Sequence, residues 1–480
     1  MSIRFYNTLT KKLDEFQPLI PNKISMYMCG PTVYDYFHIG NARSFVMADI
    51  INRYFRYKRF EVKFVMNLTD IDDKIINKAI EEKTDTKTVA EKYTQAFFED
   101  ISALRVKPAD HYPKATENVD GIIELISKLI ESESAYQVNG DVFYDVKKFA
   151  EYGKLSGKKL EDLISGARVD VNEQKKNPVD FALWKSAKPD EPFWESPWGK
   201  GRPGWHVECS VMSMKNLGET FDIHAGGNDL IFPHHENEIA QSEAATHKPF
   251  AHYWIHFGFL NIDNQKMSKS LGNFFTLRDV LKKFSAEALR FLYCQTLYSA
   301  PLNFSDDLLR NSESALKRIK NTIHQIKTSL INDGSQEPFS TKEFYSDFVE
   351  VMDDNFNTPQ ALAVIFDLCK EINLFIAKHE NLSNQNKEQM LNALQNLGGD
   401  VLGILNVNEK TDHDEKLLND LMNIIIDIRN DARKEKRFEV SDKIRDGLKK
   451  LNIELEDKKG QTTWKKIGVD YEKDQSKKIH

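Results

Sequence analysis

A strand, a turn, a helix and a second strand follow one another between residues 24 and 68, and this order constrains the fold most. Residues 24–29 (ISMYMC) are an apolar run typical of a buried strand, which Gly30-Pro31 ends. From about Gly40 to Tyr57, apolar residues recur every three or four positions, which predicts a helix. Residues 61–68 (EVKFVMNL) predict the next strand. Two strands joined by a helix form a βαβ unit, so we expect an α/β fold with a parallel sheet.

The patterns that follow indicate an interrupted sheet domain. Helices are predicted over 74–104 and 115–134. Residues 111–204 are polar and rich in Gly and Pro, which indicates an insertion. We expect the sheet to resume with 205–212 (WHVECSVM) and 220–227 (TFDIHAGG).

Beyond Phe304 the strand signal fades, and a helical bundle is predicted, with helices over 306–330, 341–380 and 386–405. A polar linker, 406–416, precedes a small mixed domain with two helices and a strand pair around NIELED and TTWKKI. The expected domains are 1–110, first half of a Rossmann-like catalytic domain; 111–204, connective insertion; 205–315, second catalytic half; 316–405, helical bundle; and 406–480, C-terminal domain.

Charge and cysteine content exclude several classes of protein. The 480 residues carry a net charge of −7, which argues against non-specific coating of nucleic acid. Residues 431–480 hold 15 Lys and Arg against 11 Asp and Glu, a local +4 that suits either a phosphate-rich partner or a solvated helical face. Four cysteines fit a reducing cytoplasm better than a disulfide framework. We see neither a signal peptide nor a membrane span of ~18 apolar residues, and expect a cytoplasmic protein.

Two short motifs suit phosphate chemistry. His38-Ile39-Gly40-Asn41 starts the first helix, where free backbone N–H groups and the helix dipole favour an anion. Lys266-Met267-Ser268-Lys269-Ser270 places two mobile cations in a loop. Either motif alone also fits a capped helix or a basic surface loop. Together they resemble the signature of class I aminoacyl-tRNA synthetases, although Asn41 stands where that signature has a second histidine.

A third set of side chains has the chemistry of metal ligands: Cys29, Cys209, His234 and Glu238. His234 and Glu238 are four residues apart and would share one face of a helix that Pro233 starts. Spacing alone does not identify a metal site, because two buried thiols and a helical His/Glu pair fit it as well. Seven of the 13 histidines lie within 206–256, however, which makes this window a candidate site.

The segments around these residues closely resemble the cysteinyl-tRNA synthetase family. The matching blocks are 28–35 (MCGPTVYD), 67–74 (NLTDIDDK), 201–210 (GRPGWHVECS) and 222–238 (DIHAGGNDLIFPHHENE), and the likeness runs from about residue 5 to Trp464. The resemblance implies a class I catalytic domain and one zinc ion bound by Cys29, Cys209, His234 and Glu238. It also implies a cysteine pocket lined by Cys29, Thr69, Trp205 and His224. Read without the family, Trp205 is a core aromatic residue and His224 a strand histidine.

The same resemblance implies the reaction. The chain would activate L-cysteine with ATP and transfer it to the 3′ end of tRNA(Cys), and zinc would select the thiol over a hydroxyl. Such selection at binding leaves no need for an editing domain. Mg2+ would accompany the triphosphate. The implied ATP-binding residues are His38, Gly40, Asn41, Lys266 and Lys269. Of these, His38, Asn41, Lys266 and Lys269 are also implied to be catalytic.

The bundle and the basic tail would bind tRNA, and we expect a monomer without membrane association. The candidates for anticodon contact are Arg433, Arg437, Phe438, Asp442 and Trp464, although each also fits a solvated charge or a core aromatic residue. Two alternatives stay open. An ATP-dependent ligase that joins cysteine to an amino sugar would share the phosphate and zinc motifs, but the basic tail argues against it. A zinc-containing RNA-binding module would leave the Lys266 to Ser270 motif unexplained.

Overall fold

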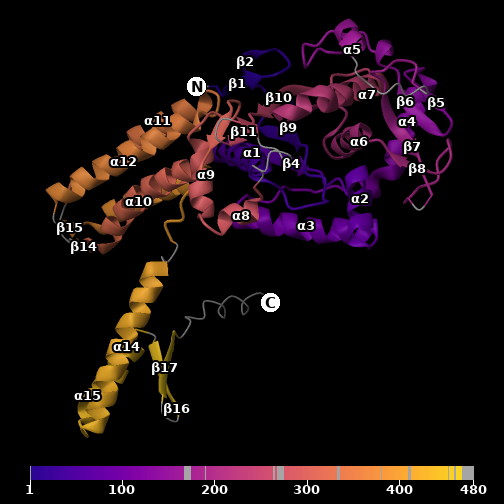
Figure 1. Ribbon diagram of the computed structural model, residues 1–480. Coiled ribbons are helices and arrows are strands. Elements are labelled where there is room, and N and C mark those ends of the chain that lie inside the picture. The colour runs from indigo at the N-terminus through magenta and orange to yellow at the C-terminus, as the bar shows by residue number, and fades with distance from the viewer. Residues whose placement is uncertain are drawn as a thin grey trace, which may run out of the picture. The chain divides into compact units, whose positions relative to one another are not determined.

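The computed structural model describes residues 2–166, 175–189, 191–262, 265–266, 275–331, 336–379, 381–408, 412–451, 453–458 and 461–466 (Figure 1). The chain forms two compact units, Met1–Val407 and Asn408–His480. In the described part of the chain, no helix combines the length and apolar composition that a membrane span requires.

A four-stranded parallel sheet forms the centre of the first unit. Its order is β10 (Ala251–Phe257), β9 (Phe221–Gly227), β3 (Lys23–Met28) and β4 (Glu61–Met66), with Met26 paired to both Phe64 and Ile223. Helix α1 (Ile39–Tyr57) connects β3 to β4 and is buried along most of its length. The predicted βαβ unit and parallel α/β fold are therefore confirmed.

The single helix expected over 74–104 is wrong, because the structure has two, α2 (Asp73–Glu82) and α3 (Thr86–Ala103). Lys83 ends α2 in the left-handed conformation, with φ 53°. The Asp85 carboxylate then accepts from the Thr88 backbone N–H at 2.9 Å and caps α3. The helical period of the two segments is similar, so periodicity did not reveal the break.

The insertion contains a small antiparallel sheet with its own apolar core around Leu183 and Trp184. The helix expected over 115–134 is shorter in the structure, because its first four residues form a 3-10 helix and the α-helix ends at Glu131, before Glu133 with positive φ. The elements are the 3-10 helices η1 (Ala115–Asn118) and η2 (Val146–Lys148), helices α4 (Val119–Glu131) and α5 (Leu160–Gly166), and strands β5 (Ala135–Val138), β6 (Asp141–Tyr144), β7 (Phe181–Ser186) and β8 (Gly201–Pro203).

The prediction that the sheet resumes at 205–212 is wrong, because this segment lies in helix α6 (Trp205–Leu217). Val207, Cys209 and Val211 alternate as in a strand, but every residue from Val207 to Ser213 is buried. A helix enclosed on nearly all sides lacks the polar face by which a helical period is detected. The second expected strand, at 220–227, is confirmed as β9.

The helices after residue 304 agree with the expected bundle, except that 341–380 holds two helices. Asn355 and Phe356 both have positive φ and separate α11 (Lys342–Asp353) from α12 (Thr358–Lys378). The other helices after residue 304 are α10 (Asp306–Thr328), α13 (Asn384–Leu394) and the π-helix η6 (Gln395–Val401). Two shorter helices, α8 (Leu277–Leu281) and α9 (Ala286–Cys294), precede this part.

Short strands complete the first unit. They are β1 (Arg4–Asn7), β2 (Lys12–Glu15), β11 (Leu260–Ile262), β12 (Gln265–Lys266), β13 (Leu302–Phe304), β14 (Leu330–Ile331) and β15 (Asn381–Leu382).

The second unit contains the two helices and the strand pair that the sequence predicts. They are α14 (Asp412–Lys434), α15 (Phe438–Lys450) and the antiparallel strands β16 (Ile453–Lys458) and β17 (Gln461–Lys466). Met422, Ile426, Leu448 and Ile453 form its core.

Candidate active site and metal centre

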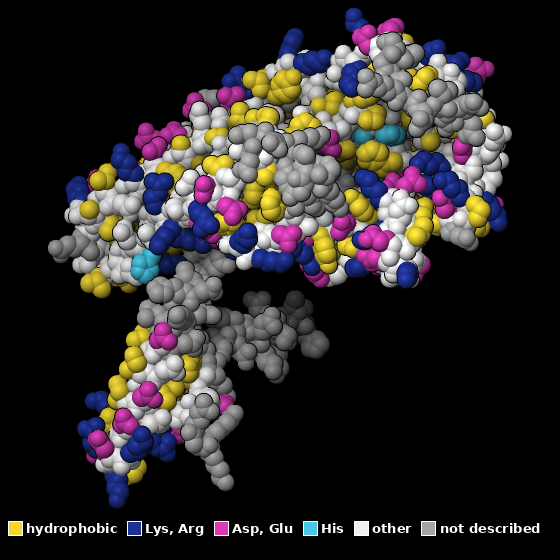
Figure 2. Space-filling model, viewed as in Figure 1, with side chains coloured by type: hydrophobic (Ala, Val, Ile, Leu, Met, Phe, Trp, Pro, Cys, Tyr) yellow, Lys and Arg dark blue, Asp and Glu magenta, His cyan; other side chains and the backbone are white. Residues whose placement is uncertain are grey.

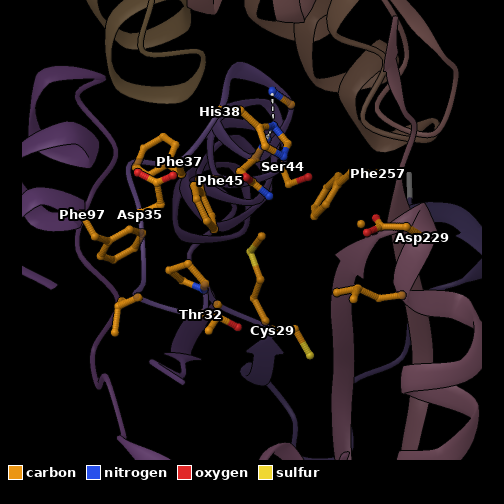
Figure 3. Close-up of a pocket in the computed structure, with 18 of the residues that line it drawn as sticks. Cys29, Thr32, Asp35, Phe37, His38, Ser44, Phe45, Phe97, Asp229 and Phe257 are labelled. Carbon is orange, nitrogen blue, oxygen red and sulfur yellow. Dashed lines mark hydrogen bonds between the residues drawn. The ribbon is translucent and has the colours of Figure 1, made fainter. Parts of the chain in front are cut away.

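A cavity of about 510 Å³ lies at the carboxyl ends of the parallel strands. Cys29 directly follows β3, Gly227 ends β9 and Phe257 ends β10, and all three line it. Figure 3 shows Cys29 and His38 on different sides of this cavity, with Phe257 and Asp229 beside it. This edge of a parallel sheet is where α/β proteins bind ligands.

The N-terminal turn of α1 forms one wall of the cavity through His38, Gly40 and Asn41. His38 is the N-cap: its Nδ1 accepts from the backbone N–H of Gly40 at 3.1 Å and of Asn41 at 3.2 Å. We expected these backbone N–H groups to face phosphate directly, whereas here they donate to the imidazole. Because Nδ1 accepts, a neutral His38 carries its proton on Nε2. The helix dipole still favours an anion at this wall.

The four predicted metal ligands meet at one buried point. Their donor atoms all lie within 4.8 Å of one another. Cys29 Sγ lies 3.7 Å from Cys209 Sγ and 3.6 Å from Glu238 Oε1, and His234 Nε2 lies 3.1 Å from Glu238 Oε1. In a tetrahedral site with bonds of about 2.0–2.3 Å, neighbouring ligand atoms are about 3.3–3.8 Å apart. The donor set therefore fits a tetrahedral metal ion.

The helix that was expected to carry both His234 and Glu238 begins later than predicted. Helix α7 (Glu236–Thr246) starts at Glu236, not at Pro233, and a π-type turn, η4 (Ile231–His235), precedes it. The 3-10 helix η3 (Asn228–Leu230) leads into this turn. Phe232 is extended inside the turn (φ −141°, ψ 130°), so a regular helix cannot begin there. His234 nevertheless keeps its position one turn before Glu238.

Burial sets the charge of the ligands. It raises the pKa of the Cys29 thiol well above its usual range, with further contributions from neighbouring Cys209 and Glu238. It lowers the pKa of His234 well below its usual range, with His206 and His224 adding to the effect. The His234 imidazole is therefore neutral at pH 7 and has a lone pair for a metal, whereas the Cys29 thiol requires a cation to ionise.

Further histidines surround the cluster, and of these the sequence prediction assigned only His224, to the cysteine pocket. His235 Nε2 lies 3.3 Å from Cys29 Sγ, and its Nδ1 lies 2.8 Å from His256 Nε2. His206 Nδ1 lies 2.9 Å from His234 Nδ1. Cys29, His224, His235 and Glu238 form a second group of donor atoms within 4.8 Å. The concentration of histidines in 206–256 was the signal that could have found these residues.

The residues expected to line a cysteine pocket occupy different places. Cys29 and Trp205 line the cavity, and Trp205 stacks on the His234 ring with centroids 4.0 Å apart. Thr69 and His224 are not among the residues that line it. His224 Nε2 lies 2.9 Å from Glu238 Oε2, and Thr69 Oγ1 donates to Glu208 at 3.2 Å. Figure 2 shows histidine side chains among hydrophobic ones in a hollow of this face.

The predicted phosphate-binding lysines are only partly within the described residues. Lys266 lies in β12, whose partner β11 continues the chain from the cavity wall at Leu260. Lys269 lies outside the described residues.

The anticodon candidates of the second unit have partners of their own. Arg433 pairs with Asp457 at 2.9 Å, Arg437 with Glu435 at 3.0 Å, and Asp442 with Arg445 at 3.1 Å. Trp464 is half-buried against the core of the unit, whereas Phe438 is 59% exposed.

Comparisons with known proteins identify the family of the chain. Residues 15–314 match a model described as the class I (C) tRNA synthetase catalytic domain, and residues 347–406 match the DALR domain. A cysteine–tRNA ligase of Geobacillus sp. (strain WCH70) is 50% identical over 97% of this chain and 99% of its own length. The chain belongs to the cysteine–tRNA ligase family. A family member from Thermococcus gammatolerans is 49% identical over 98% of this chain and its full length.

Solved structures support the fold. Methionyl-tRNA synthetase of Mycobacterium tuberculosis, in complex with methionyl-adenylate, aligns with a TM-score of 0.59 over 80% of this chain and 91% of its own. The identity is 13%, so this likeness concerns the class I synthetase fold alone.

Proposed function

We propose that this chain activates L-cysteine with ATP and transfers it to tRNA(Cys), which is the reaction that the family name describes. The observation that carries the proposal is one cavity lined by both a thiol of the donor cluster and a helix N-terminus. Cys29 belongs to the cluster, and His38 caps the helix. An amino acid side chain at the first and ATP phosphates at the second would place the cysteine carboxylate beside the α-phosphorus.

Cys29, Cys209, His234 and Glu238 would hold zinc, and the pair of thiols with an imidazole and a carboxylate suits that ion. When bound, zinc would act as a Lewis acid that binds the thiolate of cysteine more tightly than the hydroxyl of serine. The chain orients the ligands itself: His224 contacts Glu238, and His206 contacts His234. Such contacts fix the direction of a ligand's lone pair.

The remaining residues act on the phosphates. The cysteine carboxylate attacks the α-phosphorus in line and pyrophosphate leaves, so positioning and positive charge supply most of the catalysis. His38 Nε2–H, Asn41 and the N-terminal turn of α1 would bind the phosphates, and Gly40 would let them approach the backbone. Lys266 and Lys269 would close on the triphosphate, which Mg2+ accompanies, as charge develops.

The second step needs tRNA but no protein nucleophile, because a 3′-terminal ribose hydroxyl attacks the acyl-adenylate. The helical bundle within 316–405 and the C-terminal unit would bind tRNA, and the chain would act as a cytoplasmic monomer. Of the anticodon candidates, Phe438 has the exposure that stacking on a base requires, whereas Trp464 serves the core of its unit.

The amino-sugar ligase is not favoured, because full-length relatives at about half identity are cysteine–tRNA ligases. The test of the proposal is ATP–pyrophosphate exchange with cysteine and with serine, with and without a chelator, followed by charging of tRNA. Exchange with cysteine but no charging would favour the amino-sugar ligase. Pyrophosphate exchange that is equally fast with serine and with cysteine would show that the metal does not select the thiol.

A further inference from the structure

Arg43 is a buried cation beside the phosphate-binding end of α1. Its side chain is 0% exposed. Nη1 donates to the carbonyl oxygens of Gly258 at 2.8 Å and Phe259 at 3.1 Å, and Nη2 donates to those of Leu297 at 3.1 Å and Ala300 at 2.7 Å. Burial lowers the pKa of Arg43 to about 10, so it stays charged at pH 7. Four backbone carbonyls, and no carboxylate among the described residues, surround this charge.

The four carbonyls belong to two turns that lie unusually close together. Gly258 N–H donates to the Tyr298 carbonyl at 2.8 Å, and Leu302 N–H donates to the Phe259 carbonyl at 2.9 Å. A Cβ atom at Gly258 would lie 2.3 Å from the Ala300 oxygen. The guanidinium, which is planar and has donors in a fixed fork, therefore holds both turns against α1 at once.

One of these turns is the second wall of the cavity. Residues 257–260 all line it, as does the N-terminal turn of α1. The chain then passes through β11 to β12, where Lys266 begins the lysine motif. Arg43 thus joins α1 to this wall by two hydrogen bonds, and to the turn behind the wall by two more.

We propose that Arg43 is a positioning residue for adenylate formation, which fixes the 257–260 wall relative to the N-terminal turn of α1. The inference rests on the proposed function. Arg43 touches neither substrate. It sets the separation of the groups that do, and a displacement of about 1 Å in such a site lowers the rate about 100-fold. Because its carbonyl partners point at a cation, their partial negative charges do not face the anionic phosphates.

The test is steady-state pyrophosphate exchange by Arg43→Lys, with Arg290→Lys as the matched control. Arg290 is also 0% exposed, and it donates to Asp49 at 2.8 Å and to the Leu104 and Leu402 carbonyls, none of which lines the cavity. Lysine keeps the charge but cannot reach both turns. We expect kcat of Arg43→Lys to fall 10- to 100-fold, with KM for cysteine and metal content within twofold of the wild type. Arg290→Lys should lose thermal stability but keep kcat within about threefold.

Each outcome decides the matter. Wild-type kcat in Arg43→Lys, or an equal loss in Arg290→Lys, would overturn the positioning role. If Arg43→Lys does not fold, Gly258→Ala tests the same wall from the other side, and it should show the same kcat loss at constant cysteine KM. Unchanged kcat or failure to fold in Gly258→Ala would then assign these contacts to stability alone. Absence of cysteine-dependent pyrophosphate exchange in the wild type would instead contradict the proposed function.

Discussion

Replacing Cys209 by Ser should weaken metal binding about 100-fold. Cys209 Sγ lies 3.7 Å from Cys29 Sγ, a separation that fits two thiolates on one tetrahedral ion. Four-ligand zinc peptides bind the metal with about 10–16 kcal/mol, or roughly 3 kcal/mol per ligand. Since 1.4 kcal/mol is tenfold, loss of one ligand corresponds to about 100-fold in Kd. Serine fills nearly the same volume, but its hydroxyl stays protonated near pH 7 and does not replace the thiolate.

A matched control comes from the second donor group. Cys29 and Glu238 belong to both groups, Cys209 and His234 only to the first, and His224 and His235 only to the second. His235→Gln should therefore cost about tenfold in metal affinity, as for a residue that orients a ligand. Its Nε2 contacts Cys29 Sγ at 3.3 Å, so it is placed for that role.

The assay is competition for zinc with a chelating dye, together with metal analysis of each purified protein. Wild type should hold one ion per chain, and circular dichroism should show that both variants are folded. If His235→Gln loses more affinity than Cys209→Ser, the ion is held by the second donor group. If both variants keep wild-type affinity, the cluster is not the metal site, and the reasoning from ligand separations fails.

Three further predictions concern the rest of the chain. Lys269→Ala should slow pyrophosphate exchange by orders of magnitude with little change in cysteine affinity, whereas a raised ATP KM at constant kcat would assign the lysine to ground-state binding. A chain ending at Val407 should keep exchange but charge tRNA poorly, since the described catalytic candidates precede that residue; full charging by a folded truncated chain would contradict this. Hydrogen bonding to Arg429 lowers the pKa of Asp457. The pair therefore stabilises the second unit fully at pH values above the ordinary Asp pKa, and this contribution is lost as the pH falls through the lowered pKa. Asp457→Asn should lower the free energy of unfolding of the second unit by about 1 kcal/mol at pH 7, a small value because the carboxylate is partly exposed. It should also make that free energy depend less on pH in acid. Hydrogen exchange of β16 and β17 measures both effects, and an unchanged pH dependence would contradict the role of the pair.

Secondary structure was predictable where apolar residues form a short run bounded by turn residues or recur every three or four positions. The strands β3 and β4 are such runs, and the helices α1, α10 and α15 follow from the spacing of their apolar residues. Helix α6 did not, because burial on nearly all sides removed its polar face. The break after α2 depends on positive φ at one residue, Lys83, and the break before α12 on positive φ at two, Asn355 and Phe356, which neighbouring composition does not reveal.

The metal cluster shows the same division. Its four residues were named from their chemistry and from a family resemblance, but Cys29 and Glu238 are 209 positions apart, and spacing alone left them indistinguishable from core residues. His235 and His206 were not assigned, because a histidine's role depends on which ring nitrogen meets which neighbour.

By itself, the sequence determined the parallel sheet, the two short phosphate motifs, the candidate donor atoms and the order of the helical and basic segments, because these depend on local period and side-chain chemistry. Only the tertiary structure decided that His38 caps its own helix, that His224 contacts Glu238 and not the cavity, and that Arg43 joins α1 to the 257–260 wall. The physical reason is that a hydrogen bond needs two groups within about 3 Å, and only the folded chain brings distant residues that close.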